Sequence, residues 1–207
     1  MVSAEPTQSL IRGRTTLIGL RIQDFVLTPA WGYSVPAIDL QSSMSALNNI
    51  LIERGVINGN AGGSAPLILF DSLSSASATN NHISDLDFEN PVAGAIHWRS
   101  IQNSMIMNVW GGDLAGIPKM PFIKIDKSDA TNSQPARRLT LMGIEVDFGT
   151  VSNPSLFFDG DKPGQGMITV IGSRLPVVSN NGPGANQITT LHSDINSVVG
   201  DPLDVIR

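Results

Sequence analysis

The sequence of 207 residues contains no cysteine, which excludes disulfides, thiolate metal sites and a cysteine nucleophile. It also has no apolar run of about 18 residues, the length that a membrane-spanning helix needs, so membrane insertion is not expected. Charged residues make up only 15% of the chain, and the net charge is −5. The longest basic cluster is Arg137-Arg138, which is too short for a nucleic-acid footprint, so nucleic acid is not an expected partner.

Aromatic residues are scarce as well, at 5%. The beginning of the chain, "MVSAEPTQSLIRGRTTLIGL", lacks the charged-then-apolar order of a signal peptide. We therefore expect either a fragment of a longer protein or a protein that reaches its destination by assembly.

By contrast, 41% of the residues are hydrophobic, and there are 20 glycines and 13 prolines. This composition is typical of many short strands joined by polar turns.

A short text recurs along the chain at a nearly constant step. It begins "PAIDLQS" at Pro36, "PLILFDS" at Pro66 and "GAIHWRS" at Gly94, and it returns at Pro121 and Pro154. The steps are 30, 28, 27 and 33 residues, and a further step of 33 predicts the next repeat at Gln187, "QITTLHS". A period in this range indicates a solenoid or another repeat architecture.

Each repeat contains two elements. In the first, apolar residues alternate with polar ones, which predicts a strand with one buried face. The second has apolar residues at spacing i, i+3, i+5, which fits a strand bent at a corner where glycine favours a positive φ. The predicted inner column of the first element is Ile38, Ile68, Ile96, Ile123 and Leu156. The predicted corner glycines are Gly19, Gly55, Gly143 and Gly172.

The pattern predicts an all-β protein, a parallel β-helix of about six to seven coils in which each coil buries its apolar side chains against its neighbours. We expect an N-terminal arm at 1–14, one β-helix domain at 15–200 and a C-terminal tail at 201–207. The alternative is a jelly-roll sandwich, which also has many alternating strands but does not explain the constant step. Asn49, Asn80 and Asn103 precede the second elements, and their recurrence predicts an internal ladder of stacked amides.

The repeated corners, the asparagines before them and the step length resemble the right-handed parallel β-helix superfamily that includes pectate lyases. The resemblance covers roughly 15–200. It implies a right-handed β-helix, and it favours a link to polysaccharide by analogy, because the superfamily contains lyases, hydrolases, adhesins and phage tailspike domains. The chain has fewer coils than a complete family enzyme and no N-terminal amphipathic helix over its first coil, so another domain, another subunit or its own loops must cover the ends.

Charged residues converge on the outward side of the first strands. Successive coils place Asp71, Arg99 and Asp126 in one column and His97 and Lys124 in the adjacent column. This patch is a candidate catalytic site, with Asp71 and Asp126 as a carboxylate pair about 9.6 Å apart at the backbone and Arg99 as a base or as a clamp on a substrate carboxylate. His97, Lys124, Asp39 and Asp159 are candidate substrate-binding residues. The alternative is an exposed ladder of mutually neutralising charges.

Three functions follow from these features. The first is a structural or adhesive β-helix of an extracellular or virion surface assembly, such as a tail spike, in contact with polysaccharide. The second is a polysaccharide lyase or glycoside hydrolase that uses the charged patch, and the third is a noncatalytic glycan-binding module. Whether the chain is an enzyme stays open. We expect no metal, because no histidine pair has ligand spacing, and no cofactor. Uncovered coil ends predict association with other chains or copies, with a trimer as the first expectation.

Overall fold

The computed structural model describes residues 7–14, 16–42, 47–72, 78–112, 114, 116–127, 136–159, 168–181 and 188–206. Every regular element in these segments is a β-strand, and every strand pairing is parallel. No helix of the described residues is long and apolar enough to cross a membrane. The protein is therefore all-β, and the parallel pairing excludes the jelly-roll alternative, whose neighbouring strands run antiparallel.

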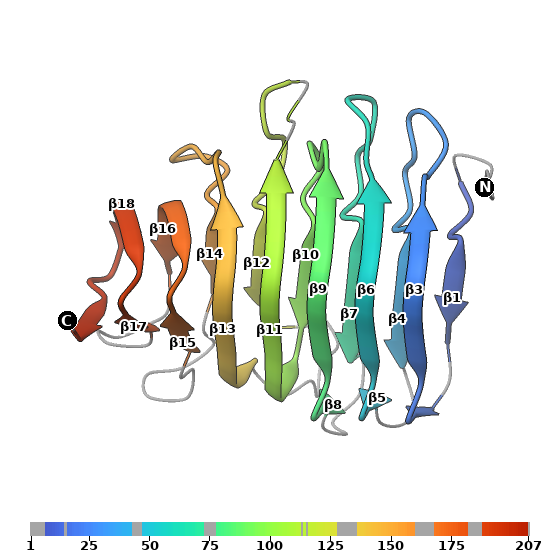
Figure 1. Ribbon diagram of the computed structural model, residues 1–207, viewed down its shortest axis with the longest axis horizontal. Coiled ribbons are helices and arrows are strands. Elements are labelled where there is room, and N and C mark those ends of the chain that lie inside the picture. Colours follow the sequence, from blue (N-terminus) through green and yellow to red (C-terminus); the bar gives the residue numbers. More distant parts are fainter. Residues whose placement is uncertain are drawn as a thin grey trace.

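Seventeen of the described strands form one strongly curled sheet with two rows, and β2 pairs with β5 in a separate two-stranded sheet (Figure 1). Strands that are neighbours in a row come from successive repeats of the sequence, which is the arrangement of a solenoid. The row at the back of Figure 1 consists of β1 (Ile11–Gly13), β4 (Ile38–Ser42), β7 (Ile68–Ser72), β10 (Ile96–Arg99), β12 (Ile123–Asp126) and β14 (Leu156–Phe158). The row at the front consists of β3 (Arg21–Leu27), β6 (Leu51–Asn58), β9 (His82–Glu89), β11 (Ile101–Gly112) and β13 (Arg137–Val146).

Short strands connect or continue these rows. Near the turn between the rows lie β2 (Leu17–Ile18), β5 (Leu47–Asn48) and β8 (Ala78–Thr79). The C-terminal coils contain β15 (Ile168–Ile171), β16 (Arg174–Asn180), β17 (Ile188–Leu191), β18 (Asp194–Gly200) and β19 (Asp204–Ile206). Parallel pairing thus extends from Ile11 to Ile206.

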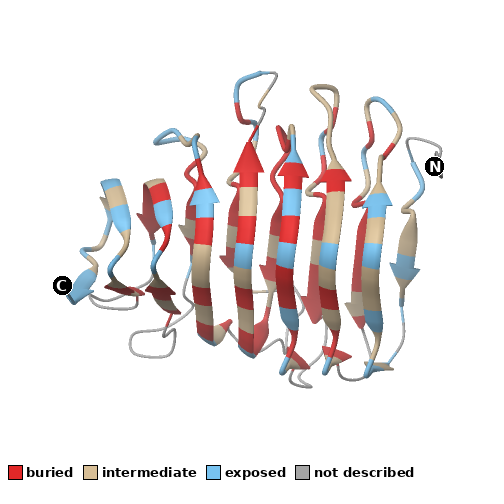
Figure 2. Cartoon of the chain, in the orientation of Figure 1, coloured by how far each residue is buried: buried red, intermediate tan, exposed pale blue. Residues whose placement is uncertain are grey.

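The inner column of the first strands is confirmed. Ile38, Ile68, Ile96, Ile123 and Leu156 are paired in register from coil to coil, and each is at most 1% exposed. Figure 2 shows the resulting alternation of buried and more exposed residues along the strands. The alternating pattern of the sequence therefore places the correct residues in the core.

The sequence prediction fails at the sixth repeat. Leu156 is in register with Val178, so the step is 22 residues, whereas the prediction placed the next repeat at Gln187. Ile188 follows Ile168 and Leu139 in the other row instead. The physical reason is that both rows are built from alternating strands, so the alternation alone does not tell which row a segment joins.

The corners in the second row form a column of backbone positions with positive φ. They are Asp24, Arg54, Asp85, Asn108, Gly143, Gly172 and His192. Gly143 and Gly172 occupy this column as predicted, but Gly55 does not. Gly55 is required for a different reason: a Cβ there would lie 2.4 Å from the Phe25 ring.

The predicted internal amide ladder is wrong in its residues. Asn49, Asn80 and Asn103 are exposed and have φ of 54°, 56° and 45°. They form a second corner column, in which asparagine is favoured because it tolerates the left-handed conformation. The asparagine after this corner, Asn81, is buried: its Oδ1 accepts from the Ile50 N–H at 3.1 Å, and its Nδ2–H donates to the Leu47 carbonyl at 2.9 Å.

Candidate functional site

The predicted charged patch lies on the outward side of β7, β10 and β12. The pairing places Arg99 between Asp71 and Asp126 and places His97 beside Lys124. Because parallel strands are about 4.8 Å apart, in-register side chains of three successive coils are within reach of one another. The coil register thus brings together the five residues that the sequence reasoning grouped.

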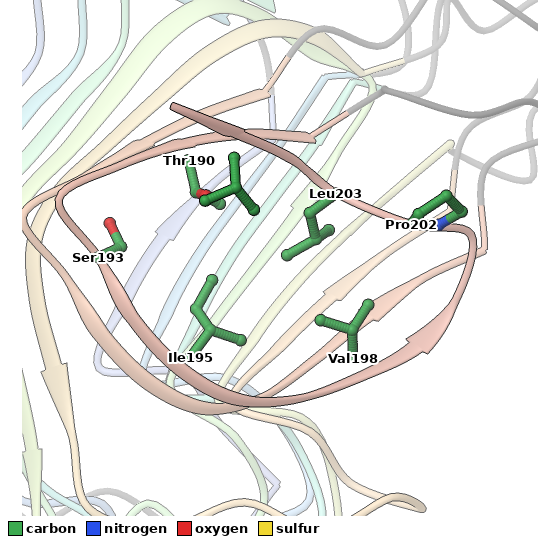
Figure 3. A pocket seen from close by; sticks show the side chains of 7 residues that line it. Thr190, Ser193, Ile195, Val198, Pro202 and Leu203 are labelled. Atoms are coloured by element: carbon green, nitrogen blue, oxygen red, sulfur yellow. The ribbon is translucent and has the colours of Figure 1, made fainter. Parts of the chain in front are cut away.

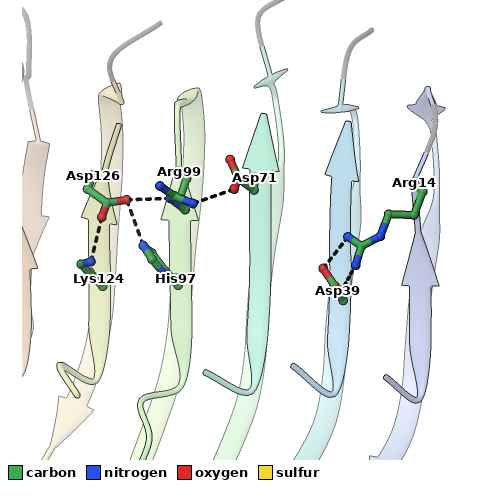
Figure 4. Close-up of polar contacts among 7 residues, drawn as sticks. All are labelled: Arg14, Asp39, Asp71, His97, Arg99, Lys124 and Asp126. Atoms are coloured by element: carbon green, nitrogen blue, oxygen red, sulfur yellow. Dashed lines mark hydrogen bonds and ion pairs between the residues drawn. The ribbon is translucent and has the colours of Figure 1, made fainter. Parts of the chain in front are cut away.

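Asp126 is the centre of this cluster (Figure 4). His97 Nε2 lies 2.9 Å from Asp126 Oδ1, and because an ionised carboxylate only accepts, the imidazole donates. Lys124 Nζ lies 2.9 Å from Asp126 Oδ2. Arg99 Nε is 3.5 Å from Asp126 Oδ1, so three cationic or donor groups surround one carboxylate.

Arg99 links this carboxylate to a second one. Its Nη1–H donates to Asp71 Oδ2 at 2.9 Å. The guanidinium therefore bridges two acids from the coils on either side, as the ladder alternative predicts. Lys124 also lies 5.8 Å from the ring centroid of Phe157, on the coil after its own.

The burial of this face differs from the expectation of an exposed ladder. The side chains of Asp71, Asp126 and Arg99 are only 3%, 14% and 17% exposed. Asp39, one step further along the sheet, is also buried. In such surroundings an ion pair is screened much less than on an open surface, but the removal of both charges from water is costly.

Asp126 titrates abnormally as a result. Burial alone would raise its pKa, but the hydrogen bonds and charges of His97 and Lys124 outweigh this effect, so the pKa of Asp126 lies below the ordinary value of 3.8. The group is therefore an anion at neutral pH. A general acid needs a raised pKa, so Asp126 is unsuited to that role.

Asp39 lies outside the cluster, and Asp159 follows Asp126 on the next coil. Asp39 forms a two-pronged ion pair with Arg14, whose Nη1 donates to Asp39 Oδ1 at 2.9 Å. Asp159 is exposed, and its backbone N–H donates to the Ile125 carbonyl at 2.9 Å. Sequence reasoning missed Arg14 because the repeat was followed only from Pro36; one step towards the N-terminus, Ile11 takes the place of Ile38.

Two hollows in the described part of the surface lie away from the cluster. One hollow of about 280 Å³ is at the end of the last coil, lined by residues that include Ile195, Val198 and Leu203. A second, of about 320 Å³, follows the corner at Gly143 and Gly172 and is lined by charged residues. Neither is lined by a residue of the cluster. Within the described ranges, no group of three or more histidine, aspartate or glutamate side chains could hold a metal ion.

The charged groups of the cluster are paired with one another and do not point freely into solvent. Both oxygens of Asp126 accept from donors of the protein, Oδ1 from His97 and Oδ2 from Lys124, and the Asp71 side chain is almost fully shielded from water. A substrate carboxylate would have to displace Asp71 or Asp126 from Arg99 in order to bind there. No protein-family model, curated protein or solved structure matches the chain, so the role of these residues is argued from the geometry.

Proposed function

We propose that this chain is a right-handed parallel β-helix of about six to seven coils, similar in architecture to the pectate-lyase-like superfamily. Its role in this proposal is structural or adhesive: it is a rod-like part of an extracellular or virion surface assembly, such as a tail spike, and it contacts polysaccharide. The working form is an oligomer of copies or an assembly with other chains, with a trimer as the first expectation.

The observation that carries this proposal is the internal pairing of the charged cluster. Asp71, Arg99 and Asp126 neutralise one another across three coils at 2.9–3.5 Å. Such a ladder orders neighbouring coils and opposes a slip in register, because a shift by one residue would separate the opposite charges and expose the core. A rod that must keep its coils aligned under load benefits from this arrangement.

The ends of the solenoid support the assembly part of the proposal. The larger exposed apolar side chains include Ile18 and Val26 on the first coil and Val198, Val205 and Ile206 on the last coils. Other exposed apolar side chains, Trp31, Ile117 and Val151, lie in connections between strands, but the groups at the two ends favour contact with another chain.

The second candidate is a polysaccharide lyase or hydrolase, and the convergence of two acids, an arginine, a lysine and a histidine favours it. In that case Arg99 would bind a uronate carboxylate and the ionised Asp126 would act as a base; its lowered pKa makes it a weak one, which counts against this candidate. Opening of the buried face would have to precede binding.

The experiment that tests these functions measures mass and polysaccharide chemistry on the same preparation. We expect light scattering at micromolar concentration to give a mass above that of one chain, and immobilised acidic or neutral polysaccharide to retain the protein without cleavage. A monomer that retains no polysaccharide would contradict the structural and adhesive role. Release of unsaturated or reducing ends, lost in Arg99→Lys at unchanged thermal stability, would establish the enzymatic candidate instead.

A further inference from the structure

The half-buried apolar side chains of the core gather at its two ends. On the first coil they are Leu10, Ile11, Leu17, Leu20, Ile22, Phe25 and Leu27. On the last coil they include Ile195 and Leu203. Inside the rod, neighbouring coils cover the side chains at the same positions: Ile52, one coil after Ile22, is 0% exposed, and Leu175, one coil before Ile195, is also 0% exposed.

The last coil surrounds an apolar hollow of about 280 Å³ (Figure 3). Ile195, Val198 and Leu203 point into it from the ribbon that encircles it. Val198 is 43% exposed, whereas Val178, its partner one coil earlier, is 0% exposed. The hollow is thus the solenoid core at the point where no further described coil covers it.

Both ends also present open strand edges. β18 pairs with β16 and β19 pairs with β17, and no described strand pairs with their other sides. At the opposite end, β1 pairs with β4 and β3 with β6, and their outer sides have no described partner. Backbone groups on such edges are available for hydrogen bonds to another parallel strand.

The two ends carry opposite charge. The first coil has Arg12, Arg14 and Arg21, with Asp24 as its one acid between 7 and 27. Residues 175–207 contain three aspartates against one arginine, Arg207. Arg21 and Asp204 are both exposed, and neither forms an ion pair with any residue that the structure describes.

The register of the rod relates the two ends directly. Arg21 pairs with Leu51, and this position continues through the coils to Thr189 and then to Asp204. If the ladder continued by one further coil with the sequence of the first coil, Arg21 would lie directly over Asp204. Ile22 would lie over Val205, in the adjoining inward position.

We propose that a second copy of this chain stacks its first coil on the last coil of this one, head to tail, with β3 of the second copy on β19, so that the parallel sheet continues from copy to copy. Arg21 of each copy then pairs with Asp204 of the next. This inference rests on the proposed assembly role and identifies the surface through which copies of the chain associate. Because the two contacting surfaces differ, the contact is heterologous and can repeat along the axis, independently of lateral association into a trimer.

Charge reversal on each side of the contact tests the proposal. We expect sedimentation velocity of the full chain to show end-to-end species that grow with concentration. Asp204→Arg alone places two arginines in contact, and Arg21→Asp alone places two aspartates in contact. Each variant should weaken association by roughly tenfold or more, as expected for exchanging an exposed attraction for a repulsion.

Mixing the two variants supplies the decisive result. Every contact in an equimolar mixture of D204R and R21D can again join an arginine to an aspartate, so the growth with concentration should return to that of the unaltered protein. Asp87→Arg makes the same charge change on an exposed position in the middle of β9, and it should leave association unchanged. Circular dichroism and melting temperature establish that each variant is folded.

The outcomes separate this inference from the proposed function. A fixed oligomer whose mass ignores D204R and R21D would overturn end-to-end stacking but leave the assembly role intact. A monomer at every concentration would overturn end-to-end stacking, and a monomer that also retains no polysaccharide would overturn both. Failure of the mixture to associate, while each variant alone is folded and dissociated, would show that Arg21 and Asp204 do not meet and would also overturn the proposed contact.

Discussion

Replacement of Arg99 by alanine tests whether the charged cluster stabilises the rod. The substitution removes the donor 2.9 Å from Asp71 and one of the cations beside Asp126, while both carboxylates stay in place. Asp71 is only 3% exposed, so water compensates for little of the lost interaction. Loss of one partner from a buried pair costs about 3–5 kcal/mol, and because Arg99 itself is 17% exposed we expect about 2–4 kcal/mol.

Arg174→Ala is the matched control. Arg174 Nη1 also lies 2.9 Å from a carboxylate, that of Asp147, but these two side chains are 56% and 55% exposed. An exposed pair of this kind contributes about 0–1 kcal/mol. The two variants thus lose the same chemical contact at the same distance and differ in its burial.

Urea unfolding at neutral pH, followed by circular dichroism, gives the two free energies of unfolding. A double-mutant cycle with Asp71→Ala then isolates the coupling to Arg99, which we expect to exceed about 1.5 kcal/mol, against at most about 0.5 kcal/mol for a cycle of Arg174 and Asp147. If Arg99→Ala costs no more than Arg174→Ala, burial does not strengthen the cluster, and the structural role assigned to it is wrong.

Three further changes test the pH dependence, the buried amide and the corner column. The pKa of Asp126 is lowered in the folded state, so the unfolded chain binds a proton first as the pH falls. The stability that ionised Asp126 contributes is therefore present above the ordinary value of 3.8 and is lost as pH falls through the lowered value. The free energy of unfolding should depend less steeply on pH below about pH 5 in Asp126→Asn than in the unaltered protein. Asn81→Ala should lower the free energy of unfolding by about 2–4 kcal/mol, since it leaves the buried Ile50 N–H and Leu47 carbonyl without their partner; a loss below about 0.5 kcal/mol would contradict this. At Asn108, where φ is 50°, Gly should be tolerated and Val should cost about 1–2 kcal/mol in thermal unfolding, and equal effects would argue against the left-handed corner.

The buried columns of inward-facing residues could be predicted from the sequence, because the alternation of apolar and polar residues along a strand is local information. Ile38, Ile68 and Ile96 repeat at a nearly fixed step, and stacking in register is the arrangement that buries all of them. The same reasoning placed Arg99 between Asp71 and Asp126, because outward positions follow automatically once the inward ones are fixed.

Burial of the outward face could not be predicted in this way. Alternation says only that Asp71 points away from the core, while its exposure depends on which distant segments pack around it. The positive-φ corners were predicted at Gly143 and Gly172 but missed at Arg54 and Asp85. In those cases neighbouring coils impose the conformation on residues that do not prefer it, and the strain is offset by the burial of the strands on either side.

The last coils are shorter than the first coils, but their inward positions still stack in the same register. In the second coil, the step from Ile57 in the front row to Ile68 in the back row is 11 positions, whereas the step between the equivalent Leu175 and Val178 is only three. The coils become smaller because this connection is lost, so that β16 and β18 each pass from one row to the other as a single strand. The inward positions that stack from coil to coil are kept. A first coil placed with Arg21 over Asp204 therefore sets residues 21–23 of β3 in register on β19, the last strand of the sheet.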